Sequence, residues 1–413
     1  MDKAIVLVES GPRLLREPLV RMLNERAAER LYFLRNAAEG SANRWIEEYV
    51  PHERILEIDF SERDGFGDRV VNAFERCGVR IGSVLASRED YVFHANEVAR
   101  CSKSPPISCA SSLALRHKGL MRQAFNCSGD LAVVRSETVD SVEEGLDKLD
   151  TFEGDIVVKP AELLGSVGVW KVCKGDRHAA ERRLAEAAAA DVVENLRSTT
   201  GISSQVVLEE YIPCLEEISV EGYVYQQRAR PLLITEKRTS PEPTFFEVGH
   251  LIPSKLIWTG RDLVFGTFRR MCHSLSLSDT VVHAEMRVRP DGLVVPVELG
   301  ARLAGDLIPQ LVAAASGIDM ERIAVALALG EDPLVETADA RGAAGIQFLN
   351  RELPPRSWNP DGMPTGVTIC RYDSVDEDLS RTGHLFVVGD TREQVLSRLH
   401  AVANQLGIGS AFV

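Results

Sequence analysis

The sequence has no hydrophobic run long enough to cross a membrane. A membrane-spanning helix needs about 20 consecutive apolar residues, and no apolar stretch in the 413 residues approaches that length. The opening residues, MDKAIVLVES, hold only a short apolar run with acidic flanks, whereas a signal peptide starts with basic residues and has a longer apolar region. We therefore expect no membrane partner and a buried first strand.

Closely spaced cysteines are also missing. The eight cysteines are scattered along the chain, and no two of them form a Cys-x-x-Cys pair. A zinc ribbon or a thioredoxin-like site is therefore not indicated. Scattered cysteines fit a compartment in which thiols stay reduced, so we expect a cytoplasmic protein.

An excess of positive charge is absent as well. The chain has 47 basic and 61 acidic residues, and its formal net charge is −14. This balance argues against broad binding to nucleic acid or to anionic membranes, although it allows a local basic pocket for a small anion. The hydrophobic share of 45% and the charged share of 26% are those of a globular protein, and the length predicts two to three domains.

Strand-like and helical patterns alternate over the first hundred residues. Strands are expected at 4–9, 31–36, 54–60 and 79–87, with helices at 18–31, 68–77 and 91–102. This alternation predicts a parallel α/β sheet. Because SKSPPIS interrupts the pattern at 102–108, we expect the first domain to span residues 1–110.

Two further units are expected after this domain. Residues 111–207 indicate a small α+β unit, with helices at 114–125, 140–150 and 178–196, a strand at 131–137 and a hairpin at 156–172. A strand at 206–212 leads into residues 208–413, which indicate a larger, mostly antiparallel domain with strands at 218–226, 231–239, 281–290 and 292–302. A strand and helix at 383–406 would close this domain.

The stretch VVKPAELLGSVGVWKV at 157–172 combines a lysine with a loop of small residues. Gly165, Ser166 and Gly168 separate two apolar strands, and Lys159 ends the first of them. A glycine loop lets backbone N–H groups approach a ligand closely, and such groups bind phosphate well. Two interpretations stay open, a phosphate-binding hairpin and an ordinary surface hairpin.

Two glutamates occupy facing strands of a later hairpin. Glu285 precedes the turn RPDG at 289–292, and Glu298 follows it within the apolar run VVPVELGAR. Adjacent carboxylates repel each other unless a cation lies between them, and Mg²⁺ binds one or two carboxylates beside phosphate oxygens. Arg302 could neutralise a transferring phosphate or an oxyanion. The alternative is a solvated hairpin edge with ordinary charges.

The strand LEEYI at 208–212 follows the small unit directly. A backbone segment at such a junction can contact an adenine edge through its N–H and C=O groups, and Glu217 could accept hydrogen bonds from ribose hydroxyls. The alternative is a strand that has one face in water.

Taken in order, these motifs resemble the ATP-grasp superfamily. The resemblance covers residues 118–302 and rests on Lys118 in RHKGLMR, VVKP, GSVGV, LEEYI, EEISVEG, Glu285 and VELGAR. It extends weakly to the opening α/β domain, which is similar to a pre-ATP-grasp domain. The segment at 383–406 is similar to the strand and helix that close carboxylate-amine ligases.

The resemblance implies that ATP lies between two α+β lobes. Lys118 and Lys159 would contact its phosphates, and Gly165, Ser166 and Gly168 would cover them as a mobile loop. Adenine and ribose would be held by Glu209, Tyr211, Ile212 and Glu217. The metal would be Mg²⁺, for which Mn²⁺ can substitute, on Glu285 and Glu298.

Within the superfamily, KRTSPEPTFFEVGHLIPS at 237–254 is similar to the subgroup that contains the bacterial L-amino acid ligases, which join free amino acids into dipeptides. This similarity implies that Glu247, His250 and Arg302 contact the small-molecule substrates, a carboxylate and an amine. Homodimers are frequent in families that resemble this one, so a homodimer is one possibility and the oligomeric state stays open.

Two positions depart from the pattern of the superfamily. Many ATP-grasp enzymes have Asn two residues after the second metal-binding glutamate, where this chain has Gly300. This departure puts a second Mg²⁺ in question. His117 stands before Lys118, where Asp or Asn is common.

The implied reaction is carbon–nitrogen ligation of the EC 6.3 type. Transfer of the γ-phosphoryl group of ATP to a carboxylate gives an acylphosphate, which an amine then attacks, so that ADP and phosphate are released. Lys159 and Arg302 would be the catalytic residues, because positive groups stabilise the charge on the transferring phosphoryl oxygens and on the oxyanion.

Two other functions remain open. An ATP-grasp carboxylase of the biotin-carboxylase type would use bicarbonate, although the chain has no biotin-attachment MKM. A non-catalytic ATP-binding regulator could have the same fold, but it would not need the complete set of Glu285, Glu298 and Arg302.

Overall fold

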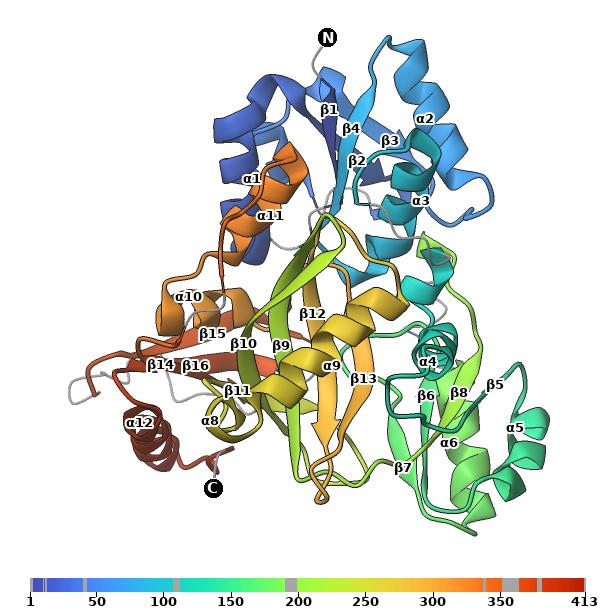
Figure 1. Ribbon diagram of the computed structural model, residues 1–413, viewed down its shortest axis with the longest axis vertical. Helices are drawn as coiled ribbons and strands as arrows, with labels where there is room; N and C mark the ends of the chain where they lie inside the picture. Colours follow the sequence, from blue (N-terminus) through green and yellow to red (C-terminus); the bar gives the residue numbers. More distant parts are fainter. Residues whose placement is uncertain are drawn as a thin grey trace.

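Three β-sheets organise the protein in a computed structural model (Figure 1). The structure describes residues 3–9, 11, 13–39, 43–106, 112–189, 199–336, 339–350, 364–376 and 381–411. No helix within these ranges is long and apolar enough to cross a membrane. The combination of a parallel sheet with two further, antiparallel sheets confirms the predicted fold class.

The first sheet is parallel, with the strand order β3-β2-β1-β4. Its strands are β1 (Ala4–Val8), β2 (Leu31–Asn36), β3 (Ile55–Ile58) and β4 (Ile81–Ala86). Its helices are α1 (Arg13–Ala27), α2 (Phe66–Arg76) and α3 (Val92–Ser102). The strand β1 is buried along its whole length, as expected for a continuous apolar run in a parallel sheet that is covered on both faces.

The second sheet has four strands in the order β5-β8-β6-β7. Its strands are β5 (Ser136–Val139), β6 (Ile156–Pro160), β7 (Trp170–Val172) and β8 (Val206–Glu210). The helices of this region are α4 (Lys118–Cys127), α5 (Val142–Lys148) and α6 (Arg177–Ala189). All of its strand pairs are antiparallel, and α5 and α6 pack on it through an apolar core of their own.

The third sheet has eight antiparallel strands in the order β13-β12-β9-β10-β11-β14-β16-β15. Four of its strands are β9 (Glu216–Tyr225), β10 (Arg228–Thr239), β11 (Glu247–Ile252) and β12 (Thr280–Val288). The others are β13 (Val294–Gly300), β14 (Ala343–Leu349), β15 (Val367–Asp376) and β16 (Arg381–Gly389). Its helices are α8 (Leu256–Thr259), α9 (Arg261–Ser274), α10 (Ile308–Ser316), α11 (Met320–Leu329) and α12 (Arg392–Gln405).

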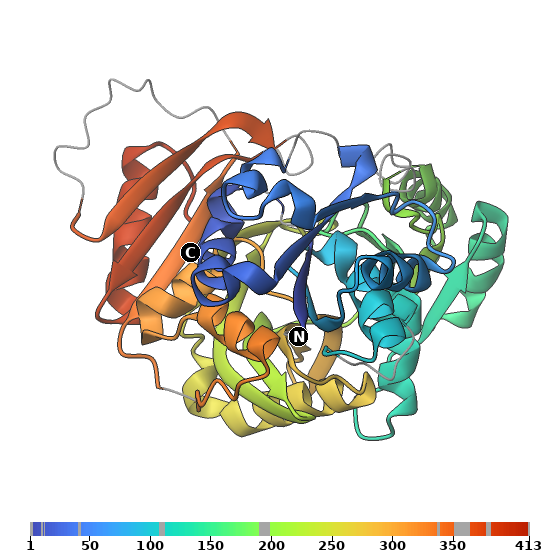
Figure 2. The ribbon, with the colours of Figure 1, turned by 90° about the horizontal axis from the view of Figure 1, so that it is seen from above.

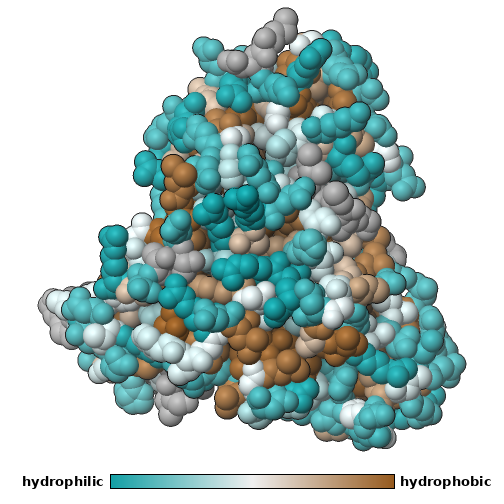
Figure 3. Space-filling model, viewed as in Figure 1, coloured by the Kyte–Doolittle hydropathy of each residue, from teal (hydrophilic) through white to brown (hydrophobic). Residues whose placement is uncertain are grey.

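Figure 2 shows that this large sheet joins the two sides of the molecule. The strands β14 to β16 and α12 lie at one side, and the second sheet with α5 and α6 lies at the other. In Figure 1, α9 crosses the face of the sheet formed by β9, β10, β12 and β13. On this face, hydrophobic residues gather beside α9 in Figure 3, and a groove there is lined by the exposed residues Trp258 and Leu263.

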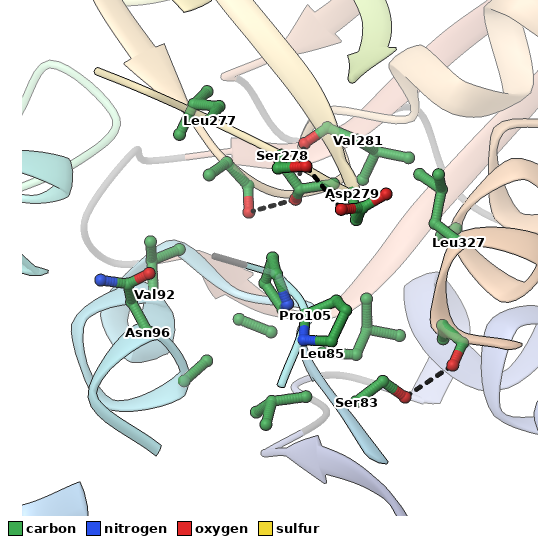
Figure 4. Close-up of a pocket in the computed structure, with 18 of the residues that line it drawn as sticks. Ser83, Leu85, Val92, Asn96, Pro105, Leu277, Ser278, Asp279, Val281 and Leu327 are labelled. Carbon is green, nitrogen blue, oxygen red and sulfur yellow. Dashed lines mark hydrogen bonds between the residues drawn. The ribbon is translucent and has the colours of Figure 1, made fainter. Parts of the chain in front are cut away.

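The C-terminal part of the chain completes the helical layer of the first sheet. The helix α11 lies beside α1 (Figure 1), and apolar residues of both helices belong to one core. The hydroxyl of Ser83 on β4 donates to the carbonyl of Ala328 at 2.6 Å. Figure 4 shows the small cavity at this junction, of about 30 Å³ and mostly apolar lining, which is room for a single water molecule.

Most of the predicted elements have the predicted type. The strand predicted at 131–137 was misplaced, because the only strand there, β5, begins at Ser136. Asn126 instead exchanges two hydrogen bonds with the backbone of Val134, so that segment is bound to α4. The predicted helix at 178–196 is observed from Arg177 to Ala189, and its last residues lie outside the described ranges.

The sequence predicts two domain boundaries, one after residue 110 and one after residue 207. The boundary between 110 and 111 lies outside the described residues. The boundary between 207 and 208 falls inside β8, whose pairing with β5 and β6 places residues up to Glu210 in the second sheet.

Candidate active site

A cavity of about 230 Å³ lies between the second sheet and the edge of the third. Its wall includes α4, the loop after β6, β8, the strands β12 and β13, and the segment 302–308. It brings together all but three of the predicted site residues: Lys118, Lys159, Gly165, Ser166, Glu209, Ile212, Glu217, Glu247, Glu285, Glu298 and Arg302. Gly168, Tyr211 and His250 do not line it.

The two predicted metal-binding carboxylates face each other across a strand pair. Glu285 on β12 and Glu298 on β13 are register partners, which confirms that the two glutamates are adjacent. Glu285 receives Lys237 Nζ at 2.7 Å, and Glu298 receives Lys118 Nζ at 3.0 Å. Each carboxylate is therefore balanced by a lysine, as adjacent like charges require.

Lys237 is a site residue that the sequence analysis missed. Its side chain is buried, and its Nζ lies 2.6 Å from Glu247 and 2.7 Å from Glu285, with Glu217 at 3.6 Å. Burial lowers the pKa of Lys237, but the three carboxylates outweigh burial and hold that pKa well above its usual value. A lysine within the apolar strand PLLITEK was the available signal, because a buried charge needs a partner.

His283 is a second residue that was missed. Its Nδ1 lies 2.8 Å from Glu221 and its Nε2 lies 3.2 Å from Glu285, so the ring bridges two carboxylates. Burial lowers the pKa of His283, but these carboxylates raise it to about 10. At neutral pH the ring is therefore protonated and donates to both glutamates, and on Glu285 it contacts Oε1, whereas Lys237 contacts Oε2.

Lys159 and Glu209 form a buried ion pair, with Arg122 as a third member. The Nζ of Lys159 donates to Glu209 at 2.6 Å, and Nε of Arg122 donates to the same carboxylate at 3.0 Å. Burial raises the pKa of Glu209, but the two cations outweigh burial and lower it to about 2. Glu209 therefore orients Lys159 toward the cavity, a contact that the sequence did not indicate.

The small-residue loop folds through positive φ angles. Gly165 has a φ of 66°, Ser166 of 60° and Gly168 of 71°, a region that favours glycine. A Cβ atom at Gly168 would also lie 2.8 Å from Cγ of Pro160. The carbonyl of Leu163 accepts from Lys118 Nζ, so the start of this loop is fixed to the same lysine that binds Glu298.

The hinge residues are held by Arg287. Its guanidinium donates to the carbonyl of Ile212 at 3.0 Å and to Glu217 at 2.9 Å. Tyr211 does not line the cavity. Its hydroxyl donates to Glu242, and Nζ of Lys171 lies 4.0 Å from the centroid of its ring. These contacts connect the second sheet to the loop that joins β10 and β11.

Arg302 is tied to the first sheet. Its Nε donates to Glu89, which follows β4, and its Nη1 donates to the carbonyl of Leu303 at 2.8 Å. Glu89 also lies close to Gly300. A Cβ atom added at residue 300 would be 2.9 Å from Oε2 of Glu89. The glycine that departs from the pattern of the superfamily is thus packed against a carboxylate of another domain.

Glu247 belongs to a second polar cluster, together with His250 and Asp306. His250 is fully buried, and its Nε2 lies 3.1 Å from Asp306. Arg381 donates to both carboxylate oxygens of Asp306, at 2.7 and 3.0 Å. The ligand atoms of the three residues lie within 4.8 Å of one another, and the two carboxylates also contact Arg381 and Lys237.

The other departure from the superfamily pattern is His117, and its contacts show what this histidine does. It precedes α4, and its Nδ1 accepts a hydrogen bond from the backbone N–H of Leu120 at 3.3 Å. Its Nε2 lies 2.9 Å from the amide oxygen of Gln205. The histidine therefore caps α4, which is the function that Asp and Asn most often have at this position.

The fold and the cavity together define an ATP-grasp architecture, in which a small antiparallel sheet closes on the edge of a large one. Residues 152–310 match the family model of the ATP-grasp domain, which confirms the predicted resemblance. No curated protein sequence matches this chain.

Solved structures that are similar to this chain include proteins named as a ligase, as synthetases and as carboxylases. An L-amino acid ligase from Bacillus licheniformis has a TM-score of 0.75 at 16% identity, with 98% of each chain covered. Phosphoribosylglycinamide synthetase from Anaerococcus prevotii has 0.65 at 15%, with 97% of this chain and 98% of the other covered. N5-carboxyaminoimidazole synthetase from Staphylococcus aureus, complexed with ADP, has 0.68 at 11%, with 97% of each chain covered.

Proposed function

We propose that this protein is an ATP-dependent carboxylate-amine ligase that joins two amino acids through an acylphosphate and releases ADP and phosphate. The observation that carries the proposal is the cavity itself, where the facing carboxylates of Glu285 and Glu298 lie in one wall with Lys118, Lys159 and Arg302. An acidic pair surrounded by cations suits a triphosphate and its metal ion.

The nucleotide would lie between the second and third sheets. Lys118 and Lys159 would neutralise its phosphates, and the N–H groups of the loop at Gly165, Ser166 and Gly168 would cover them. The hinge would bind adenine and ribose through the backbone at Tyr211 and Ile212 and through the carboxylates of Glu209 and Glu217. Because Lys159 is paired with Glu209, this glutamate would act on the nucleotide mainly by positioning the lysine.

Glu285 and Glu298 would hold Mg²⁺. The two side chains are 22% and 24% exposed and face one cavity, and carboxylate oxygens are ligands that Mg²⁺ binds beside phosphate oxygens. The metal ion would offset the negative charge of the phosphates of ATP. Lys237 and His283 keep Glu285 ionised and oriented for this purpose.

The second substrate would meet Glu247 and Arg302. Burial raises the pKa of Glu247 even though Lys237 opposes this shift, so its carboxylate can take a proton from an amine that arrives as an ammonium ion. His250 contacts Asp306 rather than the cavity and would position that side chain. Arg302 would face the oxyanion that forms when the amine attacks the acyl carbon.

The test is an ATP-dependent phosphate-release screen over pairs of free amino acids, with the product mass measured for each active pair. We expect phosphate release that needs both amino acids and a product whose mass equals their sum minus one water. Phosphate release that depends on bicarbonate instead would identify a carboxylase. Tight ATP binding without turnover under any condition would identify a regulator.

A further inference from the structure

Arg63 connects the first domain with the unit that contains the second sheet. It lies in the segment between β3 and α2. Its Nη2 donates to Glu162 at 2.8 Å, and its Nε donates to the carbonyl of Thr200 at 2.9 Å. The guanidinium also lies 4.5 Å from the centroid of the Phe93 ring. Since residue 162 follows β6 and residue 200 precedes β8, one side chain holds both segments.

Glu162 joins the same two segments from the inside. Its side chain is fully buried, and a buried carboxylate needs partners. Its Oε2 accepts from Arg63, and its Oε1 accepts from the backbone N–H of Ser203 at 3.0 Å. Only 12% of the Arg63 side chain is exposed. The ion pair is therefore shielded from water, which strengthens the attraction between its charges.

Two further contacts hold the segment before β8 against the first domain. Asn36, at the end of β2, donates from Nδ2 to the carbonyl of Thr199 at 2.8 Å. Gly201 has a φ of 66°, and a Cβ atom there would collide with the carbonyl oxygen of Ser61. The backbones of the two domains therefore touch at this point. Residues that follow β2 and β3 thus fix the base of the second sheet.

The loop 163–168 begins directly after Glu162. Most of its residues line the cavity, whereas Arg63 and Glu162 lie outside the lining. The carbonyl of Leu163 accepts from Nζ of Lys118, so the start of the loop is held from the cavity side as well. Any effect of Arg63 on a ligand must therefore pass through Glu162 and this loop.

We propose that Arg63 is a positioning residue for the phosphates of ATP, and that it acts through Glu162 on the loop 163–168. Ordering a loop around a ligand costs conformational entropy. A loop whose start is already fixed loses less of this entropy, so it binds the ligand more tightly. The inference rests on the proposed ATP site and adds to it a residue of the N-terminal domain.

The effect should be confined to the phosphates. In the proposed site the loop covers the phosphates, whereas adenine and ribose lie at the hinge. The carbonyl of Ile212 and the carboxylate of Glu217 at this hinge are held by Arg287 on β12 rather than by Arg63. A contact that only attached the two domains would instead weaken the whole nucleotide site or leave it unchanged.

The first experiment measures Kd by calorimetry for a non-hydrolysable ATP analogue with Mg²⁺ and for adenosine. In Arg63→Gln we expect Kd for the analogue to rise about tenfold, because a hydrogen bond between charged groups that holds the loop is lost, while Kd for adenosine stays at the wild-type value. Arg76→Gln, at the exposed end of α2, is the matched control. An equal rise for both ligands, or no rise for the analogue, would overturn the proposal.

Two further variants test the route through Glu162. Glu162→Gln should raise Kd for the analogue as Arg63→Gln does, and the double variant should raise it no further, because both changes break one contact. Additive losses would show that Arg63 does not act through Glu162. Arg63→Lys keeps the charge but cannot donate to Glu162 and Thr200 from one planar group, so it should give an intermediate Kd. This variant also serves if Arg63→Gln does not fold.

Hydrogen exchange without ligand decides the anchoring on its own. We expect residues 161–168 to exchange faster in Arg63→Gln than in the wild type or in Arg76→Gln, while the turn at 289–292 stays unchanged. Unchanged exchange at 161–168 would refute the proposal. A wild-type protein that binds the analogue but releases no phosphate with any amino acid pair would contradict the ligase function and leave the Kd comparison valid. A wild-type protein that binds neither ligand would contradict the ATP site, and exchange alone would then report whether Arg63 holds the loop.

Discussion

Glu209 illustrates how a single buried carboxylate can connect stability with the site. Its folded pKa of about 2 lies below the ordinary value of 4.5 because of Arg122 and Lys159, which outweigh the effect of burial. The stabilisation is therefore fully present above pH 4.5 and is lost as the pH falls toward 2. It amounts to about 3 kcal/mol.

We predict that Glu209→Gln flattens this acid dependence. The variant should be less stable than wild type at pH 7, because Lys159 and Arg122 lose their buried counter-charge, and the gap should narrow as the pH falls from 4.5. Urea unfolding at several pH values measures both effects. Parallel stability curves for the two proteins would show that folding leaves the pKa of Glu209 unchanged.

Substitution of Arg302 tests whether this residue acts in catalysis. Arg302→Met should lower kcat by about 10² to 10³, which is the usual cost of removing an oxyanion donor, and should change KM for ATP little. Its partner Glu89 keeps Arg116 as a counter-charge, so we expect a modest change in Tm. Steady-state kinetics beside thermal unfolding separates the two roles, since a large loss of Tm with near-normal kcat would leave Arg302 a purely structural residue.

The residues that the sequence could indicate share one property. Lys118, Lys159, Glu285 and Glu298 stand in short motifs whose order is itself a signal, whereas Lys237 and His283 are recognised only by their partners. Lys237 binds Glu247 and Glu285 from two other strands. Such contacts depend on which strands of the large sheet are neighbours, and the residues around Lys237 and His283 in the chain do not indicate those neighbours.

At the scale of elements, the loop 163–168 joins β6 to β7 over the cavity. Its positive φ angles at Gly165 and Gly168 and the exposure of Leu164, at 41%, suit a segment that adjusts to a ligand. We predict that proteolytic cleavage within this loop is suppressed by a non-hydrolysable ATP analogue with Mg²⁺. The hairpin turn at 289–292 serves as the internal control, because it lies away from the cavity lining.

Equal cleavage of the loop with and without the analogue would refute this closure. Loss of cleavage at both sites would show a general stabilisation and would leave the loop without a special function. Mass spectrometry of the fragments identifies which bond is cut.

Alternating strands and helices were predictable in the first sheet because its core strands are short apolar runs between amphipathic helices. Several strands and helices of the large sheet were harder to predict from the sequence. The strands β11, β14 and β15 and the helices α9, α10 and α11 were not assigned in advance. The helix α11 is apolar over most of its length and is buried between layers, so it lacks the amphipathic period on which helix prediction depends.

At the scale of the whole molecule, the cavity lies between the second and third sheets. The first sheet contacts its lining through the ion pair of Glu89 with Arg302. A ligand that contacts both sheets should stabilise the folded protein by mass action, by about 3 kcal/mol at 100 times its Kd. We predict that Mg-ATP raises Tm more than ATP with EDTA. The double variant Glu285→Gln and Glu298→Gln should lose the part of this shift that depends on Mg²⁺.

Calorimetric melting with and without EDTA tests this prediction. An equal rise of Tm for ATP with and without Mg²⁺ in the wild-type protein would exclude these two glutamates as the metal-binding pair. A Mg²⁺-dependent rise that survives in the double variant would place the metal ion elsewhere.

The contact of Glu89 with Gly300 and Arg302 has a consequence for protein engineering. The N-terminal domain does more than precede the ATP-grasp core, because it fills the space beside β13 that a larger side chain at residue 300 would need. Chimeras that graft the N-terminal domain of a relative onto this core should therefore work only when residues 89, 300 and 302 are inherited as a set. In a library of such grafts, active clones should retain the pairing of an acidic residue at 89 with glycine at 300.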